Sequence, residues 1–190
     1  MASETDIANL ALQRLGVKRI TDLTEDSVPA REMNFAYPFT RDAELRDNVW
    51  GFAVKRFRLA ADSTAPEWGR ANSFTLPADF LALAPKYPED LDPARDWLIE
   101  NGKILTDDSA PLDGRYVARI TDAGLFDPLF VQALASRLAF DLCEKITQST
   151  VRLEALAQRY QSDIRRARHR NAIEKPTPLI QNPSWIQVRA

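Results

Sequence analysis

The chain has 190 residues, of which 45% are hydrophobic and 27% are charged, and its formal net charge is −2. This length fits one domain of ordinary size, or one domain with a sub-module, and it allows a core that needs no disulfide or metal. A slightly acidic chain of this kind excludes a bulk basic field that would hold the protein on nucleic acid or on an acidic membrane.

The charge is spread unevenly along the chain. Residues 147–190 hold eight Lys or Arg against three Asp or Glu, a net charge of +5, so the remaining residues carry −7. This asymmetry suggests subunits whose opposite ends attract one another.

Cysteine and histidine usage restricts the chemistry. Cys143 and His169 are each the only residue of their type, so the chain cannot form an intrachain disulfide or a common structural zinc site. The first ten residues are polar and acidic, unlike a signal peptide, and no apolar run reaches membrane-spanning length. We therefore expect a protein that is made and used in a reducing cytoplasm.

Two helices are predicted near the N-terminus. Ser3 and Asp6 are residues that cap the start of a helix, and Gly16 is placed to end it. The second helix begins near Ser27, and Pro38 inside it is expected to kink the helix or to divide it in two. The apolar positions are Ile7, Leu10, Ala11 and Leu15 in the first helix, and Met33, Ala36, Tyr37, Ala43 and Val49 in the second.

From Gly51 onward the apolar residues alternate with polar ones, which favours strands over helices. Residues 97–106 predict a β-hairpin in which Asn101 and Gly102 fill the two positive-φ positions of a type I′ turn. The other predicted strands cover residues 52–59, 73–76, 80–83 and 115–120.

Two further helices are predicted to close the folded body. Apolar residues recur at helical spacing in both, and beyond Glu174 three prolines exclude further helix. The apolar positions are Phe126, Phe130, Leu134, Leu138, Leu142 and Ile146 in one helix, and Leu153, Leu156, Tyr160, Ile164 and Ala167 in the other.

The predicted fold class is α+β, with a small antiparallel β module inserted into a helical bundle. The first and last helices are expected to pack together as that bundle. The expected divisions are residues 1–50 for the N-terminal helices, 51–120 for the inserted β module, 121–173 for the C-terminal helices and 174–190 for an extended docking tail.

A search for catalytic chemistry finds little, and we expect no enzymatic activity and no metal or other cofactor. The single histidine lies in a basic helical run, which favours a solvated residue over a general base. The position of Cys143 beside the Leu138 and Leu142 stripe favours a buried core thiol over a nucleophile. Two pairs of adjacent acids, Glu25 with Asp26 and Asp107 with Asp108, could serve a glycosidase but are more typical of turns and surfaces. A hydrolase acting on cell-wall polymer is therefore the weakest alternative.

Four arginines form a basic stripe along the last helix. Asp163 lies in the same stripe, spaced to pair with Arg159 and Arg166. The stripe favours a surface ion-pair ladder or a charged subunit interface, and a DNA-binding module is the alternative function. Its members are Arg152, Arg159, Arg166 and Arg170.

The C-terminal tail carries large apolar side chains on a segment that its prolines keep from forming a helix. Ordering such a segment costs conformational entropy that one docked tail barely offsets, whereas several tails docking together tip the balance. We therefore predict a docking arm, with Leu179, Ile180, Trp185, Ile186 and Val188 as its contact residues.

Short motifs follow one another in the order found in one protein family. They cover most of residues 7–170: Asn9-Leu10-Ala11-Leu12 with Leu15-Gly16, Ala30-Arg31, Arg41-Asp42 with Leu45-Arg46, Trp50-x-Phe52-Ala53 before Lys55-Arg56, Leu76-Pro77-Ala78-Asp79, Ile104-Leu105-Thr106-Asp107, Arg115-Tyr116, Thr121-Asp122, Phe126-Asp127-Pro128-Leu129-Phe130 and Ala135-x-Arg137-Leu138-Ala139. In this order the chain resembles phage tail tubular protein A, the head-to-tail adaptor family of short-tailed phages. Val49 stands where that family usually has a proline.

The resemblance implies a structural virion protein of the tail or neck, without an active site and without a membrane. It implies a homo-oligomeric ring, a dodecamer in that family, between the portal protein and the tail nozzle, with genome DNA passing through as cargo. It also implies that Trp50 and Phe52 join the β module to the bundle, while Lys55, Arg56 and Arg58 face outward. Ring subunits make heterologous contacts, which suits a chain with an acidic body and a basic C-terminal part.

Overall fold

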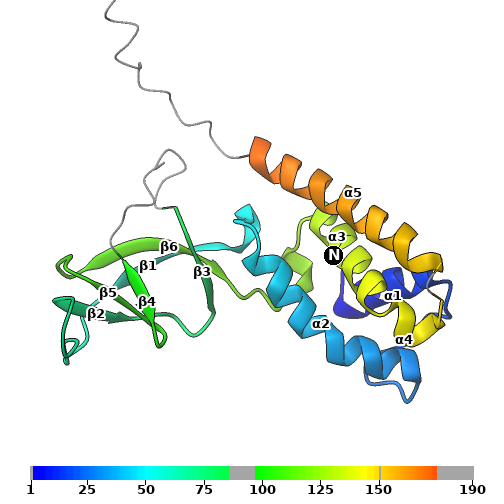
Figure 1. The fold of residues 1–190 in the computed structure, drawn as a ribbon, viewed down its shortest axis with the longest axis horizontal. Helices are drawn as coiled ribbons and strands as arrows, with labels where there is room; N and C mark the ends of the chain where they lie inside the picture. Colours follow the sequence, from blue (N-terminus) through cyan, green and yellow to red (C-terminus); the bar gives the residue numbers. More distant parts are fainter. Residues whose placement is uncertain (1, 86–96, 150, 175–190) are drawn as a thin grey trace, which may run out of the picture.

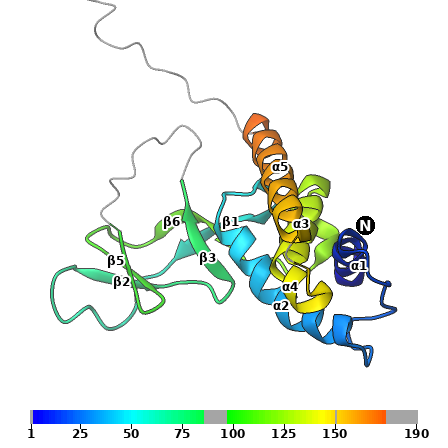
Figure 2. The same ribbon diagram turned by 45° about the vertical axis from the view of Figure 1, so that its right-hand side comes forward.

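The structure is a computed structural model that describes residues 2–85, 97–149 and 151–174. Its helices gather in one part of the molecule and its strands in another (Figure 1), which confirms the α+β class. Turning the molecule shows the helices grouped around α3, with the β module to one side (Figure 2). The predicted docking tail lies outside the described residues.

Helix α1 (Glu4–Leu15) has the caps that its sequence predicts. The Ser3 hydroxyl accepts a hydrogen bond from the backbone N–H of Asp6 (3.1 Å), and the Asp6 carboxylate accepts one from the N–H of Ser3 (2.9 Å). Gly16 follows with a left-handed backbone, φ 70°, which ends the helix. These reciprocal bonds fix where the chain enters the bundle.

Helix α2 (Val28–Arg46) is one continuous helix, so the predicted division at Pro38 is wrong. Proline has no backbone N–H, so Pro38 cannot donate the helical hydrogen bond to the carbonyl of Asn34, four residues earlier. Asn34 is exposed, so water can hydrate that carbonyl and the helix continues. The helix start matches the prediction, because the Ser27 hydroxyl accepts from the N–H of Ala30 (3.3 Å).

Helix α3 (Pro128–Asp141) is the centre of the bundle and packs against α1, α2 and α5 (Val151–Ile173). Its small residues Ala133, Ala135 and Ala139 are fully buried, which allows neighbouring helices to approach closely. The first and last helices therefore meet mainly through α3, rather than by packing directly on each other.

The helix predicted over residues 126–146 is two helices, since the chain breaks at Leu142 before the short α4 (Cys143–Thr147). The start is also later than predicted. Asp127 caps α3 by accepting from the N–H groups of Leu129 (2.8 Å) and Phe130 (3.2 Å), and Pro128 occupies the first helical position. Phe126 before the first boundary and Cys143 after the second are both buried, so apolar spacing alone did not reveal these boundaries.

Within residues 51–85 and 97–120, the β module consists of two three-stranded antiparallel sheets. One has the order β1-β6-β3, from Val54–Leu59, Leu112–Ala118 and Phe80–Ala84. The other has the order β2-β5-β4, from Asn72–Thr75, Lys103–Thr106 and Leu98–Glu100.

The β4–β5 hairpin has the predicted turn, because Asn101 (φ 47°) and Gly102 (φ 71°) both have positive φ. Strand β1 begins later than predicted, since Gly51–Ala53 forms a 3-10 turn. Strand β6 spans residues 112–118 rather than 115–120. In the β1–β6 register Phe57 lies opposite Gly114, where an added Cβ would stand 2.3 Å from the Phe57 ring. The glycine therefore makes room for this buried aromatic side chain.

The joint between bundle and β module is built around Trp50, which is buried. Its indole N–H donates to the backbone carbonyl of Glu44 (2.8 Å), and its ring centroid lies 5.0 Å from that of Phe130. Phe52 is half-buried and lies 5.1 Å from Phe130 and 5.8 Å from Phe126, centroid to centroid. Both aromatic residues thus anchor the start of β1 to α3.

Polar contacts also hold the two parts together around this joint. Asn171 of α5 accepts from the N–H of Gly51 (2.8 Å). The guanidinium of Arg46 donates to the carbonyl of Leu81 in β3, and Arg119, next to β6, pairs with Asp42 of α2 (2.6 Å). The C-terminal half of α2 therefore carries most of the connection to the β module.

Candidate functional site

The basic stripe of α5 is largely engaged within the chain. Arg152 donates to the carbonyl of Leu15 at the end of α1 (2.5 Å). Arg159 pairs with Asp163 at 3.8 Å, and Arg170 pairs with Glu174 at 3.1 Å. These contacts occupy three of the four guanidinium groups that could have contacted DNA phosphates.

Arg166 is different, because no hydrogen bond or ion pair joins it to another residue within the part of the chain that the structure describes. It is exposed, and it follows Arg159 by seven residues, which places both on the same side of the helix. The predicted pairing of Asp163 with Arg166 is not made. Arg166 thus remains an exposed cation on this flank.

Asp163 instead belongs to a buried polar cluster that the sequence did not reveal. Arg14 of α1 lies 3.6 Å from Asp163 and donates to Ser136 (2.5 Å) and to the carbonyl of Gln132 (2.7 Å). Ser136 also donates to Asp163 (2.7 Å). Burial, together with the nearby Arg159, lowers the pKa of Arg14 to about 10. The cluster ties α1, α3 and α5 together.

The residues considered for catalysis lie apart from one another. His169 is exposed on α5. Cys143 is buried, as the core-thiol reading predicted, with its Sγ 3.5 Å from the carbonyl oxygen of Ser149.

The two pairs of adjacent acids form hydrogen bonds and ion pairs that hold loops in place. Asp107 binds the N–H of Ala71 and the guanidinium of Arg70, both at 2.9 Å, and Asp108 accepts from the indole of Trp97 (2.7 Å). Glu25 accepts from the N–H of Thr21 (2.8 Å), and Asp26 pairs with Arg31 (2.9 Å).

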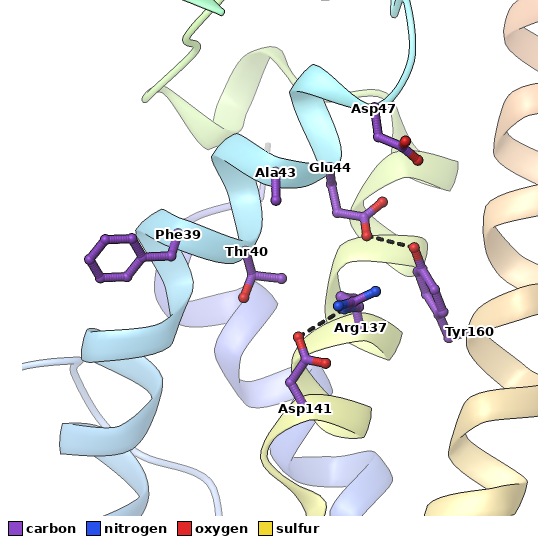
Figure 3. A pocket seen from close by; sticks show the side chains of 8 residues that line it. All are labelled: Phe39, Thr40, Ala43, Glu44, Asp47, Arg137, Asp141 and Tyr160. Carbon is purple, nitrogen blue, oxygen red and sulfur yellow. Dashed lines mark hydrogen bonds and ion pairs between the residues drawn. The ribbon is translucent and has the colours of Figure 1, made fainter.

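Helices α2, α3 and α5 enclose a pocket of about 450 Å³ with an acidic lining (Figure 3). Helix α2 supplies a run of side chains to one wall, α3 supplies an arginine and an aspartate, and α5 supplies a tyrosine. The residues that matter for its chemistry are Phe39, Glu44, Asp47, Arg137, Asp141 and Tyr160.

Glu44 is the buried carboxylate of this pocket, with 5% of its surface exposed. One oxygen, Oε1, accepts a hydrogen bond from the hydroxyl of Tyr160 (2.6 Å), whereas Oε2 is buried without a partner among the described residues. Burial raises the pKa of Glu44, and the Tyr160 bond opposes that shift. Burial and the same bond raise the pKa of Tyr160 to about 12.

The cations around Glu44 already face other acids. Arg137 pairs with Asp141 (2.8 Å), and its guanidinium lies over the Tyr160 ring, 5.3 Å from the centroid. Arg168 pairs with Asp47 at the rim. Glu44 is therefore the acid of this group without an ion-pair partner of its own among the described residues.

The pocket and the basic stripe lie on opposite flanks of α5. Tyr160 and Arg168 reach toward α2, where the pocket opens. Arg152 and Arg159 lie on the flank that faces α1, because Arg152 binds Leu15 and Arg159 meets the Arg14–Asp163 pair. The helix thus presents an acidic pocket on one flank and a free arginine on the other.

The pocket was not predicted from the sequence, although the spacing of residues in α2 gives one indication of it. Buried positions of α2 include Tyr37, Arg41 and Glu44, which lie on one face at helical spacing. Two charged residues on an inward face indicate a polar site, since buried charges are normally paired. Arg41 and Glu44 are not part of the apolar repeat that predicts the helix.

No group of three or more His, Cys, Asp or Glu suited to a metal ion is found in residues 2–85, 97–149 and 151–174. Within the same ranges, no helix has both the length and the apolar character needed to cross a membrane. No protein-family model matches the chain, and no curated protein sequence matches it either. The function is therefore inferred from the chain's own residues.

Proposed function

We propose that the protein is a structural virion component, a head-to-tail adaptor that forms a ring between portal and tail nozzle and lets genome DNA pass. The observation that carries this proposal is the exposure of large aromatic side chains on both parts of the molecule. Such residues typically mark surfaces that contact other proteins.

On the helical bundle, the exposed aromatics lie on the outer side of α2. Phe35 is 72% exposed and Phe39 is 67% exposed, with their ring centroids 5.5 Å apart. Val28, seven residues before Phe35, is exposed on the same helix. A helix of a self-sufficient subunit normally turns such residues inward, so this face suits a neighbouring protein.

On the β module, Trp68 in the β1–β2 loop is 86% exposed. Leu98 and Ile99 are also exposed, and they lie on β4, an edge strand whose outer side has no neighbouring strand among the described residues. Exposed edge strands and apolar loop residues offer a second protein surface. The β-module loops therefore suit contact with the next tail component.

Two such surfaces on one subunit fit a connector better than an enzyme with one cleft. In this proposal the bundle and the C-terminal tail contact the portal, neighbouring copies meet side by side in the ring, and the β module faces the nozzle. Many copies around one axis would let weak individual contacts add up to a stable assembly.

Deleting residues 176–190 tests the portal contact. We expect the truncated protein to fold with an unchanged melting temperature but to fail to join portal-bearing capsids in a sedimentation assay. Normal attachment of the truncated protein would show that the tail is dispensable.

Duplex DNA binding separates this proposal from the DNA-binding alternative. A module that used the four arginines of α5 would bind tightly at low salt, and each arginine removed would reduce the log–log salt slope by roughly one. We expect no such binding from the adaptor.

A further inference from the structure

The pocket between α2 and α5 contains a hydrogen-bond acceptor that a ligand could bind. Oε2 of Glu44 is buried and has no partner among the described residues, although a buried carboxylate oxygen normally accepts a hydrogen bond. Glu44 is one of the eight residues that line the pocket. The pocket has a volume of about 450 Å³ and is open to solvent. A ligand with N–H donors would satisfy this oxygen.

The charge of the pocket favours a cationic ligand. Among the described residues, Glu44, Asp47 and Asp141 face two cations, Arg137 and Arg168, so the group has one negative charge in excess when all are ionised. A guanidinium fits both the unpaired buried oxygen and the excess negative charge, since it is a permanent cation that donates several hydrogen bonds from one plane.

We propose that this pocket receives the partner subunit's Arg166 from a second copy of this chain, which joins adjacent subunits head to tail. This proposal rests on the proposed ring, because a contact between different flanks of one helix repeats around a closed ring. Arg166 is exposed and uncommitted within the described chain, and it lies on the flank of α5 opposite the pocket. The exposed Phe35 and Phe39 on α2 would add apolar contact area beside the ion pair.

The experiment is a double-mutant cycle on self-association of the full chain. Glu44→Gln keeps the shape and the Tyr160 bond but removes the charge, and Arg166→Ala removes the donor. Association of each variant and of the double variant is measured by sedimentation velocity over rising concentration, alone and with the purified portal assembly as nucleus. We expect each single change to weaken association about fivefold or more and the double change to weaken it little further, as for a coupled pair.

Matched controls keep the test specific. Arg165→Ala removes the neighbouring arginine, whose guanidinium binds only the carbonyl of Gln161 in its own helix among the described residues (2.9 Å), and should leave association unchanged. Glu67→Gln changes an exposed glutamate of the β module and should do the same. Arg166→Lys keeps a cation and should retain part of the wild-type association. If Glu44→Gln does not fold, Arg166→Glu replaces it, because an added carboxylate at the pocket should block association.

The outcomes separate this contact from the proposed function. Rings that form equally well with Arg166→Ala overturn the contact and leave the adaptor proposal standing. A weakening by Glu44→Gln alone, or additive effects of the two changes, also overturns the pairing. A wild-type chain that stays monomeric even on the portal assembly overturns the ring, and with it this contact.

Discussion

Glu44 shows how one buried side chain can link pH to stability and assembly. Its carboxylate is held by Tyr160 on one oxygen and left without a partner on the other, in surroundings that include Asp47, Arg137 and Arg168. Because burial outweighs these partners, its pKa lies above the ordinary value. The folded state therefore holds the Glu44 proton more tightly than the unfolded state does.

The raised pKa of Glu44 determines how the stability of the protein changes with pH. Below the ordinary pKa of the unfolded chain the contribution of Glu44 to stability is fully present, and it is lost as pH rises through the raised folded pKa. We expect the free energy of unfolding of the wild type to fall relative to Glu44→Gln as pH rises above about 4.5, the ordinary pKa of a glutamate. Urea titrations of both proteins at several pH values measure this difference, and parallel curves would contradict it.

Tyr160 supplies the hydroxyl that holds Glu44 in place. Tyr160→Phe keeps the ring under Arg137 but leaves Oε1 of Glu44 without its donor, so we expect a loss of about 1–3 kcal/mol in the free energy of unfolding. Chemical denaturation measures the loss. Combined with Glu44→Gln the effect should shrink, because a neutral amide needs the hydroxyl less than a carboxylate does.

At the scale of elements, the bundle is held by polar contacts as well as by its apolar core. Arg14 is the clearest case, since its side chain is 3% exposed and binds residues of α3 and α5 from its place on α1. Removing it leaves Asp163 and Ser136 with fewer partners in a dry environment. A buried ion pair that loses one member typically destabilises a fold strongly.

We therefore expect Arg14→Ala to lower the free energy of unfolding by about 3 kcal/mol. Arg31→Ala is the matched control, because among the described residues Arg31 pairs with Asp26 alone, both side chains are exposed, and the pair should contribute less than about 1 kcal/mol. Equal effects of the two changes, measured by denaturation, would show that the Arg14 cluster adds no special stability.

In the β module, the ring of Phe57 lies directly against Gly114. Gly114→Ala would place a methyl group inside the contact distance of the Phe57 ring, so we expect a loss of about 1–3 kcal/mol. Gly51→Ala is the control, since its nearest neighbour atom would lie at 3.6 Å. Melting temperatures of both variants decide whether this contact limits the stability of the module.

Elements with local signals could be predicted from the sequence, and elements decided by tertiary contacts could not. The Asn101-Gly102 turn and the Ser3–Asp6 cap act over a few residues, so both were predicted correctly. The break at Leu142 was missed because buried residues continue on both sides of it, which leaves the apolar repeat intact. The pocket was missed for a related reason, since Glu44 and Tyr160 are 116 residues apart in the chain.

At the scale of the whole molecule, exposed apolar residues divide between the two parts. Phe35 and Phe39 belong to the bundle, and Trp68 belongs to the β module. In the proposed adaptor, Phe35 and Phe39 lie between neighbouring subunits, and Trp68 faces the nozzle. Changes on the two parts should therefore affect different steps of assembly.

Replacing both Phe35 and Phe39 by Ser should leave the melting temperature unchanged, because both rings already face solvent, while self-association weakens. Trp68→Ser should have the reverse pattern, with normal self-association and weaker attachment of the nozzle component. Sedimentation of the free chain and of capsid-bound rings distinguishes the two steps. If both variants failed at the same step, the division of labour between the two parts would be wrong.

Helix α2 forms one wall of the acidic pocket, and its C-terminal half also carries the links to the β module through Arg46, Asp42 and the Trp50 anchor. In the proposed ring, a neighbour that displaced α2 at the pocket would therefore also displace the strands that these contacts join to it. The orientation of the β module in an assembled particle would then depend on the neighbouring subunit that binds the helical bundle. In the proposed ring, contact between subunits and alignment of the β modules would then occur together.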